Sequence, residues 1–86
     1  MIPNTEFLVV GAGLTGAVMA RALRDAGRGV LVLDRRAHMA GNIHDHVHPS
    51  GIRIHTYGPH YFRTNDEELW QYVNRFASFY AYEPAL

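Results

Sequence analysis

The stretch that decides the fold runs from residue 7 to residue 34 and reads FLVVGAGLTGAVMARALRDAGRGVLVLD. Its first four residues, 7–10, form a short apolar run, which is typical of a parallel strand covered on both faces. The next six, GAGLTG at 11–16, match the pattern G-x-G-x-x-G. This pattern is meaningful only when it follows a strand and opens a helix, and both conditions hold here.

The second half of the stretch completes the unit. Residues 14–26 are rich in alanine and long side chains, which favour a helix, and Gly27 ends it. Residues 30–33 form a second apolar strand, and Asp34 follows it directly. We therefore predict a Rossmann-like βαβ dinucleotide-binding unit.

Each glycine of the motif has its own physical role. Gly11 permits the tight turn out of the strand, Gly13 lets the backbone approach a pyrophosphate, and Gly16 lets the helix pack on the sheet. The first N–H groups of the helix, around Leu14 and Thr15, have no partner within it, and the helix dipole adds positive charge there. We predict that a diphosphate binds at this helix start.

Polar side chains at the end of the second strand complete the predicted nucleotide contacts. Asp34 lies 18 residues beyond Gly16, where an acidic side chain accepts hydrogen bonds from ribose hydroxyls. Arg35 and Arg36 follow, and arginine's planar fork suits a phosphate or adenine contact. A solvated strand end is the alternative for both arginines. Residues 35–42 show no clear period, and we expect them to form a loop past the nucleotide.

Residues 43–57 predict a β-hairpin, because alternating residues flank Pro49-Ser50-Gly51. Residues 44, 46 and 48 are histidines and would share one face. A metal site is one interpretation, but we favour solvated or partner-facing imidazoles, because no carboxylate on that face completes a ligand set. We therefore predict no metal.

A rigid turn follows the hairpin at residues 57–65, YGPHYFRTN. Gly58 lets the backbone approach something flat, and Pro59 fixes the loop that presents His60. His60 could donate a hydrogen bond to a cofactor or substrate; a structural histidine is the alternative.

A second helix is predicted after this turn. Asn65 would cap it, with Glu68 as the capping-box partner. Trp70 is expected to pack in a core or between domains, and residues 78–82 could begin another strand. Four apolar residues share one helix face: Leu69, Tyr72, Val73 and Phe76.

Composition limits the function classes. Eight basic and eight acidic residues balance, which argues against a nucleic-acid or anionic-membrane footprint. The sequence contains no cysteine, so thiolate metal sites and cysteine nucleophiles are excluded, and no apolar run is long enough for a membrane span. We expect a cytoplasmic protein. A complete dinucleotide-binding domain needs about 150 residues, so residues 1–86 are expected to be the incomplete N-terminal portion of a larger domain.

Three segments in this order resemble the N-terminal part of UDP-galactopyranose mutases. They are GAGLTGAVMARAL at 11–23, AGNIHDH at 40–46, which resembles the family's G-G-N loop, and TYGPHYFRTND at 56–66, which resembles its Y-G-P-H-x-F-x-T-N stretch. Three residues depart from the family pattern. Ala40 replaces the first glycine of a doublet, Asp34 replaces a longer glutamate, and Arg63 replaces a common histidine.

The resemblance implies a flavoenzyme that interconverts the pyranose and furanose forms of UDP-galactose, with a role in cell wall biosynthesis. It implies FAD, active when reduced, whose N5 attacks the anomeric carbon while UDP leaves, with no net redox change. Gly41 and Asn42 would contact FAD, and Gly58, Pro59 and His60 would lie beside the isoalloxazine, with His60 tuning or orienting it. Uracil and diphosphate contacts would lie beyond Leu86, and a homo-oligomer is possible.

Two alternatives remain open at this point. One is another FAD-dependent oxidoreductase, such as an amine-oxidase-like enzyme, which shares the glycine turn. The other is a segment of 86 residues with no activity of its own, because the sugar site is missing.

Overall fold

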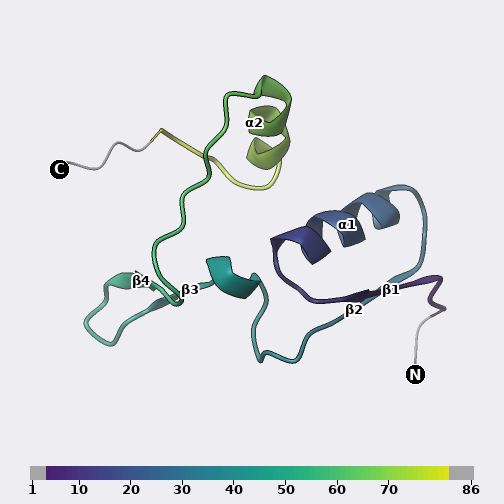
Figure 1. The fold of residues 1–86 in the computed structure, drawn as a ribbon, viewed down its shortest axis with the longest axis horizontal. Coiled ribbons are helices and arrows are strands. Elements are labelled where there is room, and N and C mark those ends of the chain that lie inside the picture. The colour runs from purple at the N-terminus through teal and green to yellow at the C-terminus, as the bar shows by residue number, and fades with distance from the viewer. Residues whose placement is uncertain (1–3, 82–86) are drawn as a thin grey trace.

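The computed structural model describes residues 4–81, which form a parallel βαβ unit, a hairpin and a second helix (Figure 1). The elements, in chain order, are β1 (Phe7–Val10), α1 (Leu14–Asp25), β2 (Val30–Leu33), the 3₁₀ turn η1 (Gly41–Ile43), β3 (Asp45–Val47), β4 (Arg53–His55) and α2 (Glu67–Asn74). The predicted mixed α/β, Rossmann-like class is confirmed.

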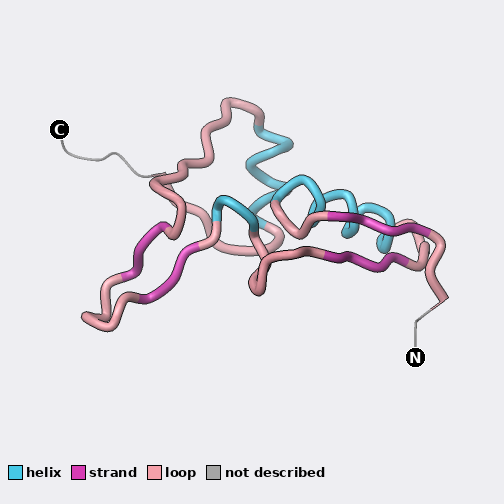
Figure 2. Tube along the Cα trace, turned by 60° about the horizontal axis from the view of Figure 1, so that its bottom comes forward, coloured by secondary structure: helices cyan, strands magenta, loops and turns pink. Residues whose placement is uncertain are grey.

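The βαβ unit has the predicted topology. β1 and β2 pair in parallel, from Phe7 opposite Val30 to Val10 opposite Leu33. α1 lies along one face of this two-stranded sheet (Figures 1 and 2). Gly27 takes a positive φ of 81° immediately after the C-cap of α1, as expected for a glycine that ends a helix. The helix and both strands therefore lie where the sequence predicted them.

The hairpin is also confirmed. β3 and β4 pair antiparallel, with His46 opposite Ile54. The turn closes through the His48 amide, which donates to Ile52 O at 2.8 Å, and Gly51 takes a φ of 90°. Arg53 and Asp45 form an exposed ion pair across the two strands at 2.7 Å.

The start of α2 differs from the prediction by one residue. The N-cap is Asp66, whose Oδ1 accepts from the amides of Glu68 at 2.9 Å and Leu69 at 3.2 Å. Asn65 is therefore not the cap, and Glu68 is too near the cap to form the predicted capping box. The physical reason is that Thr64 Oγ1 accepts the Asp66 amide at 2.9 Å, which turns the Asp66 carboxylate onto the helix start.

The segment after α2 is not a strand over residues 78–81, and Tyr82 lies outside the described residues. Phe79 instead donates its amide to Asn74 Oδ1 at 2.9 Å, which folds the chain back against α2. Its ring meets Trp70 edge-on, with the two centroids 6.3 Å apart. Trp70 therefore packs in a small, partly exposed aromatic cluster and not in the predicted core, because no described side chain is buried.

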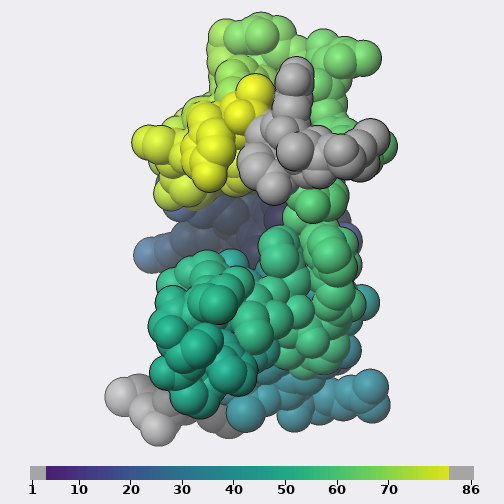
Figure 3. All heavy atoms as spheres, turned by 90° about the vertical axis from the view of Figure 1, so that its left-hand side faces the viewer, coloured from purple at the N-terminus to yellow at the C-terminus, as the bar shows by residue number. Residues whose placement is uncertain are grey.

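The described residues enclose no core. Among residues 4–81, no side chain is buried. Of the predicted apolar helix face, Leu69 lies in α2 and Phe76 lies just beyond its end, and both are 49% exposed. Figure 3 shows the hairpin and the α2 segment as two masses, with part of the βαβ unit visible behind them. Within this described part, no helix is long and apolar enough to cross a membrane.

Candidate nucleotide-binding site

A hollow of about 530 Å³ opens where the glycine turn meets the loop that follows β2. Eight of the thirteen predicted cofactor-binding residues line it. They are Gly11, Gly13, Leu14, Thr15, Gly16, Arg36, Gly41 and Asn42. The structure therefore brings together two segments that the sequence could only propose separately.

The glycine turn has the geometry that its sequence predicts. Gly11 has a φ of 112°, and its amide donates to Leu33 O at 2.6 Å, which closes the turn onto β2. A Cβ on Gly16 would clash with Gly11 O and lie 3.3 Å from Val9 Cγ1, so only glycine lets α1 pack this closely. No side chain caps the start of α1, which leaves its first N–H groups open toward an anion.

Residues 40–42 lie directly on this turn. The Ala40 amide donates to Ala12 O at 2.8 Å, and a Cβ on Gly41 would lie 2.9 Å from the Cα of Gly13. Gly13 thus packs against another backbone segment, a role that sequence analysis did not assign to it. Ala40 itself has a φ of 79°, in the left-handed region that favours glycine.

Asp34 braces the turn from the end of β2. Its Oδ2 accepts the Ala12 amide at 2.7 Å, and its Oδ1 accepts the Arg36 amide at 2.7 Å. These two backbone hydrogen bonds, the one from Ala12 foremost, lower the pKa of Asp34 below its ordinary 3.8. The carboxylate is therefore ionised at neutral pH, and each oxygen keeps a lone pair that could accept from a ribose hydroxyl.

The two arginines after Asp34 have different surroundings. Arg36 lines the hollow, donates to Asn42 Oδ1 at 3.0 Å and holds its guanidinium 4.4 Å from the centre of the Tyr57 ring. Arg35 is exposed and makes no hydrogen bond or ion pair with other residues of the 4–81 range. The solvated alternative therefore describes Arg35, and Arg36 is the arginine placed at the hollow.

The turn at residues 58–60 lies apart from this hollow. His60 lines a second hollow of about 550 Å³, together with Phe62, Trp70 and Phe79. Its Nδ1 donates to Gly58 O at 2.7 Å, within the turn itself. In this arrangement, Gly58, Pro59 and His60 do not join the residues of the glycine turn.

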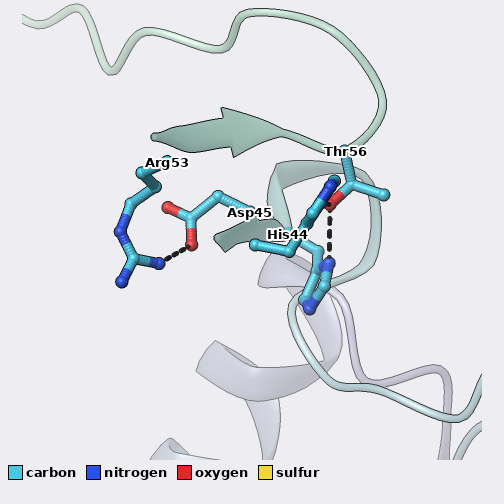
Figure 4. A network of polar contacts seen from close by, with 5 residues as sticks. His44, Asp45, Arg53 and Thr56 are labelled. Carbon is cyan, nitrogen blue, oxygen red and sulfur yellow. Dashed lines mark hydrogen bonds and ion pairs between the residues drawn. The ribbon is translucent and has the colours of Figure 1, made fainter. Parts of the chain in front are cut away.

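The hairpin histidines form no metal site with the other described residues. Within residues 4–81, no three or more His, Asp or Glu side chains lie close enough together to hold a metal ion. The Thr56 hydroxyl lies 2.8 Å from Nδ1 of His44 (Figure 4) and equally far from Nδ1 of His46. His48 Nδ1 instead lies 2.9 Å from the Ser50 hydroxyl. The predicted common face of the three histidines therefore holds for His44 and His46 alone.

Two residues near the site, His38 and Tyr57, were not predicted from the sequence. His38 Nε2 lies 2.8 Å from the Tyr57 hydroxyl, which joins the loop after β2 to the end of the hairpin. No pattern in the sequence marked them: residues 36, 38 and 40 are half-buried and residues 35, 37 and 39 are exposed, but this alternation exists only in the structure. Such a loop has one inward face, although its sequence has no clear hydrophobic period.

Comparison with known proteins supports a dinucleotide-binding fold. Residues 9–76 match the family model of the NAD(P)-binding Rossmann-like domain. The chain is 42% identical over 80 residues to a probable UDP-galactopyranose mutase of Klebsiella pneumoniae, covering 92% of this chain and 21% of that protein. It is 39% identical over 82 residues to a dTDP-fucopyranose mutase of Escherichia coli, covering 94% and 22%.

A third relative extends this similarity. A UDP-galactopyranose mutase of Mycoplasma pneumoniae is 35% identical over 72 residues, covering 83% of this chain and 18% of the relative. The resemblance to UDP-galactopyranose mutases is therefore confirmed. The chain spans about a fifth of the length of the curated relatives it matches.

Proposed function

Because the chain belongs to the NAD(P)-binding Rossmann-like domain family, we propose that its glycine-turn hollow binds the diphosphate of FAD in a UDP-galactopyranose mutase. The observation that carries the proposal is the joining of the G-x-G-x-x-G turn and the Gly41-Asn42 loop around one hollow. The mutase relatives, which match more than four fifths of the chain, support the choice of enzyme class.

The residues around the hollow fit a dinucleotide. The open N–H groups at the start of α1 would bind the diphosphate, and the lack of a Cβ on Gly11 and Gly13 leaves backbone there for close approach. Arg36 adds a positive charge on the opposite wall, held by Asn42. The ionised Asp34 would accept from the adenosine ribose.

The chain's own share of the reaction is to hold and orient the cofactor. When bound and reduced, FAD supplies the nucleophile for the anomeric carbon, in an isomerisation without net redox change. The turn at Gly58, Pro59 and His60 would lie near the flavin ring, where His60 would orient it or tune it. Residues outside this chain would hold the UDP-galactose.

The first experiment is a UV-visible spectrum of the full-length protein after FAD is added and excess is removed. We expect retained flavin and, after dithionite reduction, conversion of UDP-galactofuranose to the pyranose form. Retention of NAD(P) in place of FAD would contradict the proposal that FAD is the cofactor. Flavin retention with only oxidase or dehydrogenase activity would contradict the proposed mutase activity.

A substitution in the glycine turn tests the location of the site. We expect Gly13→Val to abolish flavin retention, because a Cβ there already lies 3.7 Å from the Gly41 Cα, and the branched side chain would crowd both this segment and the position proposed for the pyrophosphate. Ala37→Val is the matched control, since Ala37 is exposed in the nearby loop and does not line the hollow. Flavin-loaded Gly13→Val protein would place the cofactor elsewhere.

A further inference from the structure

Two imidazole rings stack where the loop after β2 meets the hairpin. The ring centroids of His38 and His44 lie 3.8 Å apart, and their planes differ by 23°. His38 Nδ1 donates to Met39 O at 2.7 Å, so the neutral ring uses Nε2 to accept from the Tyr57 hydroxyl at 2.8 Å. We call His38, His44 and Tyr57 the histidine clasp.

The clasp is tied to the nucleotide hollow through one short loop. Arg36 lies two residues before His38 and places its guanidinium over the ring of Tyr57. Asn42, which accepts from Arg36, lies two residues before His44. Arg36 and Asn42, two of the side chains that line this wall of the hollow, are therefore linked to the clasp through Tyr57, and a displacement of the Tyr57 ring would disturb both.

The stack tolerates little added charge. Two imidazolium rings at 3.8 Å repel each other, and Arg36 already places a positive charge against Tyr57. The other ionisable groups around the two rings are Asp34, Asp45, His46 and, through its ion pair with Asp45, Arg53. Both carboxylates have partners already, since Asp34 accepts two backbone amides and Asp45 pairs with Arg53.

The titration of His44 agrees with this geometry. Desolvation, followed by the neighbouring His38, lowers the pKa of His44 below its ordinary 6.5. A histidine with a lowered pKa stabilises the folded arrangement above its ordinary value. That contribution is lost as the pH falls from 6.5 through the lowered value.

We propose that the histidine clasp is a pH-sensitive positioning device, which holds Arg36 and Asn42 at the nucleotide hollow when neutral and releases them when both imidazoles are protonated. The proposal rests on the proposed function, because it assumes that the hollow holds FAD. His38 acts through Arg36 and is a positioning residue. Cofactor affinity should therefore fall on mild acidification.

The test measures the FAD dissociation constant of the full-length protein by flavin fluorescence from pH 8.0 to about 5.5. We expect the FAD affinity of the wild type to fall by up to about tenfold for each unit by which the pKa of His44 differs between the FAD-bound and the FAD-free protein. His44→Phe keeps a stacking ring that cannot be protonated, so its affinity should change little over the range. His48→Phe, at the hairpin turn away from the clasp, is the matched control and should behave like wild type.

An equal pH dependence in wild type and His44→Phe would overturn the clasp. If His44→Phe fails to fold, NMR titration of the wild-type His44 imidazole decides the question, because the pKa of His44 must lie below the ordinary 6.5. A pKa of His44 at or above 6.5 would also overturn the proposal. A protein that binds no FAD at pH 8 contradicts the proposed function, and the imidazole titration then decides the clasp by itself.

Discussion

A single backbone conformation, at Ala40, links the loop after β2 to the glycine turn. Ala40 has a φ of 79° and donates its amide to Ala12 O. An L-residue other than glycine is strained there, which costs roughly 1–2 kcal/mol. We expect Ala40→Gly to raise the free energy of unfolding of the full-length protein by up to about 1 kcal/mol, since added freedom of the unfolded chain offsets part of the gain.

Urea denaturation measures this change. The matched control is Ala37→Gly in the same loop, because Ala37 is not among the described residues with positive φ. It should lower stability slightly. A loss of stability in both variants would show that Ala40 is not strained.

The contribution of Asp34 to stability depends on pH. Its pKa is lowered by the amides of Ala12 and Arg36, so its stabilising effect is full above the ordinary 3.8 and is lost as the pH falls through the lowered value. Asp34→Asn replaces one acceptor by an NH₂ group that faces an amide donor. We expect its urea midpoint to lie below that of wild type at pH 5, with the gap narrowing toward pH 3.

The control for this prediction is Asp45→Asn, which removes the exposed ion pair with Arg53 and one carboxylate near His44 but no hydrogen bond to the glycine turn. Exposed pairs contribute little, so its midpoint should stay close to wild type at pH 5. A constant gap for Asp34→Asn between pH 5 and pH 3 would mean that ionisation of Asp34 does not support the turn.

Among the elements, α2 depends on its first residue. Asp66 accepts two amides at the start of the helix, and loss of such a cap costs about 1 kcal/mol. We expect Asp66→Ala to lower the unfolding free energy of the full-length protein by about that amount in urea denaturation. Asn65→Ala separates this cap from the one predicted by sequence and should change stability by less than about 0.5 kcal/mol. A larger loss of stability in Asn65→Ala than in Asp66→Ala would show that Asn65 is the cap.

The elements also show what could be predicted from sequence. The βαβ unit and the hairpin follow from local signals, namely apolar runs, helix formers and glycines at turns. The cap of α2 was missed by one residue because Asn65 and Asp66 are both good caps, and the hydrogen bond from Asp66 to Thr64 decides between them. The distinction between Arg35 and Arg36, and the roles of His38 and Tyr57, depend on how the loop meets the hairpin, which no local pattern encodes.

At the scale of the whole molecule, the chain exposes more surface than a compact protein of its size. The chain exposes 7515 Å², whereas a compact protein of this mass exposes roughly 5,100 Å². Its radius of gyration is 15.7 Å, against about 12 Å for a compact domain of this length. Apolar side chains such as Leu8, Val10 and Leu33 are open to solvent on the sheet. The elements are thus well formed locally but share no buried core that would couple them.

This lack of a shared core predicts how residues 1–86 behave alone. Burial of apolar surface is the main force that makes unfolding cooperative, and no described side chain is buried. We expect the isolated chain to show a broad thermal transition by circular dichroism, to retain no FAD after desalting and to convert no UDP-galactofuranose. The full-length protein, measured in parallel, should unfold sharply. A sharp transition with flavin retained by the isolated chain would contradict this, because the glycine-turn hollow would then be stable without any further covering surface.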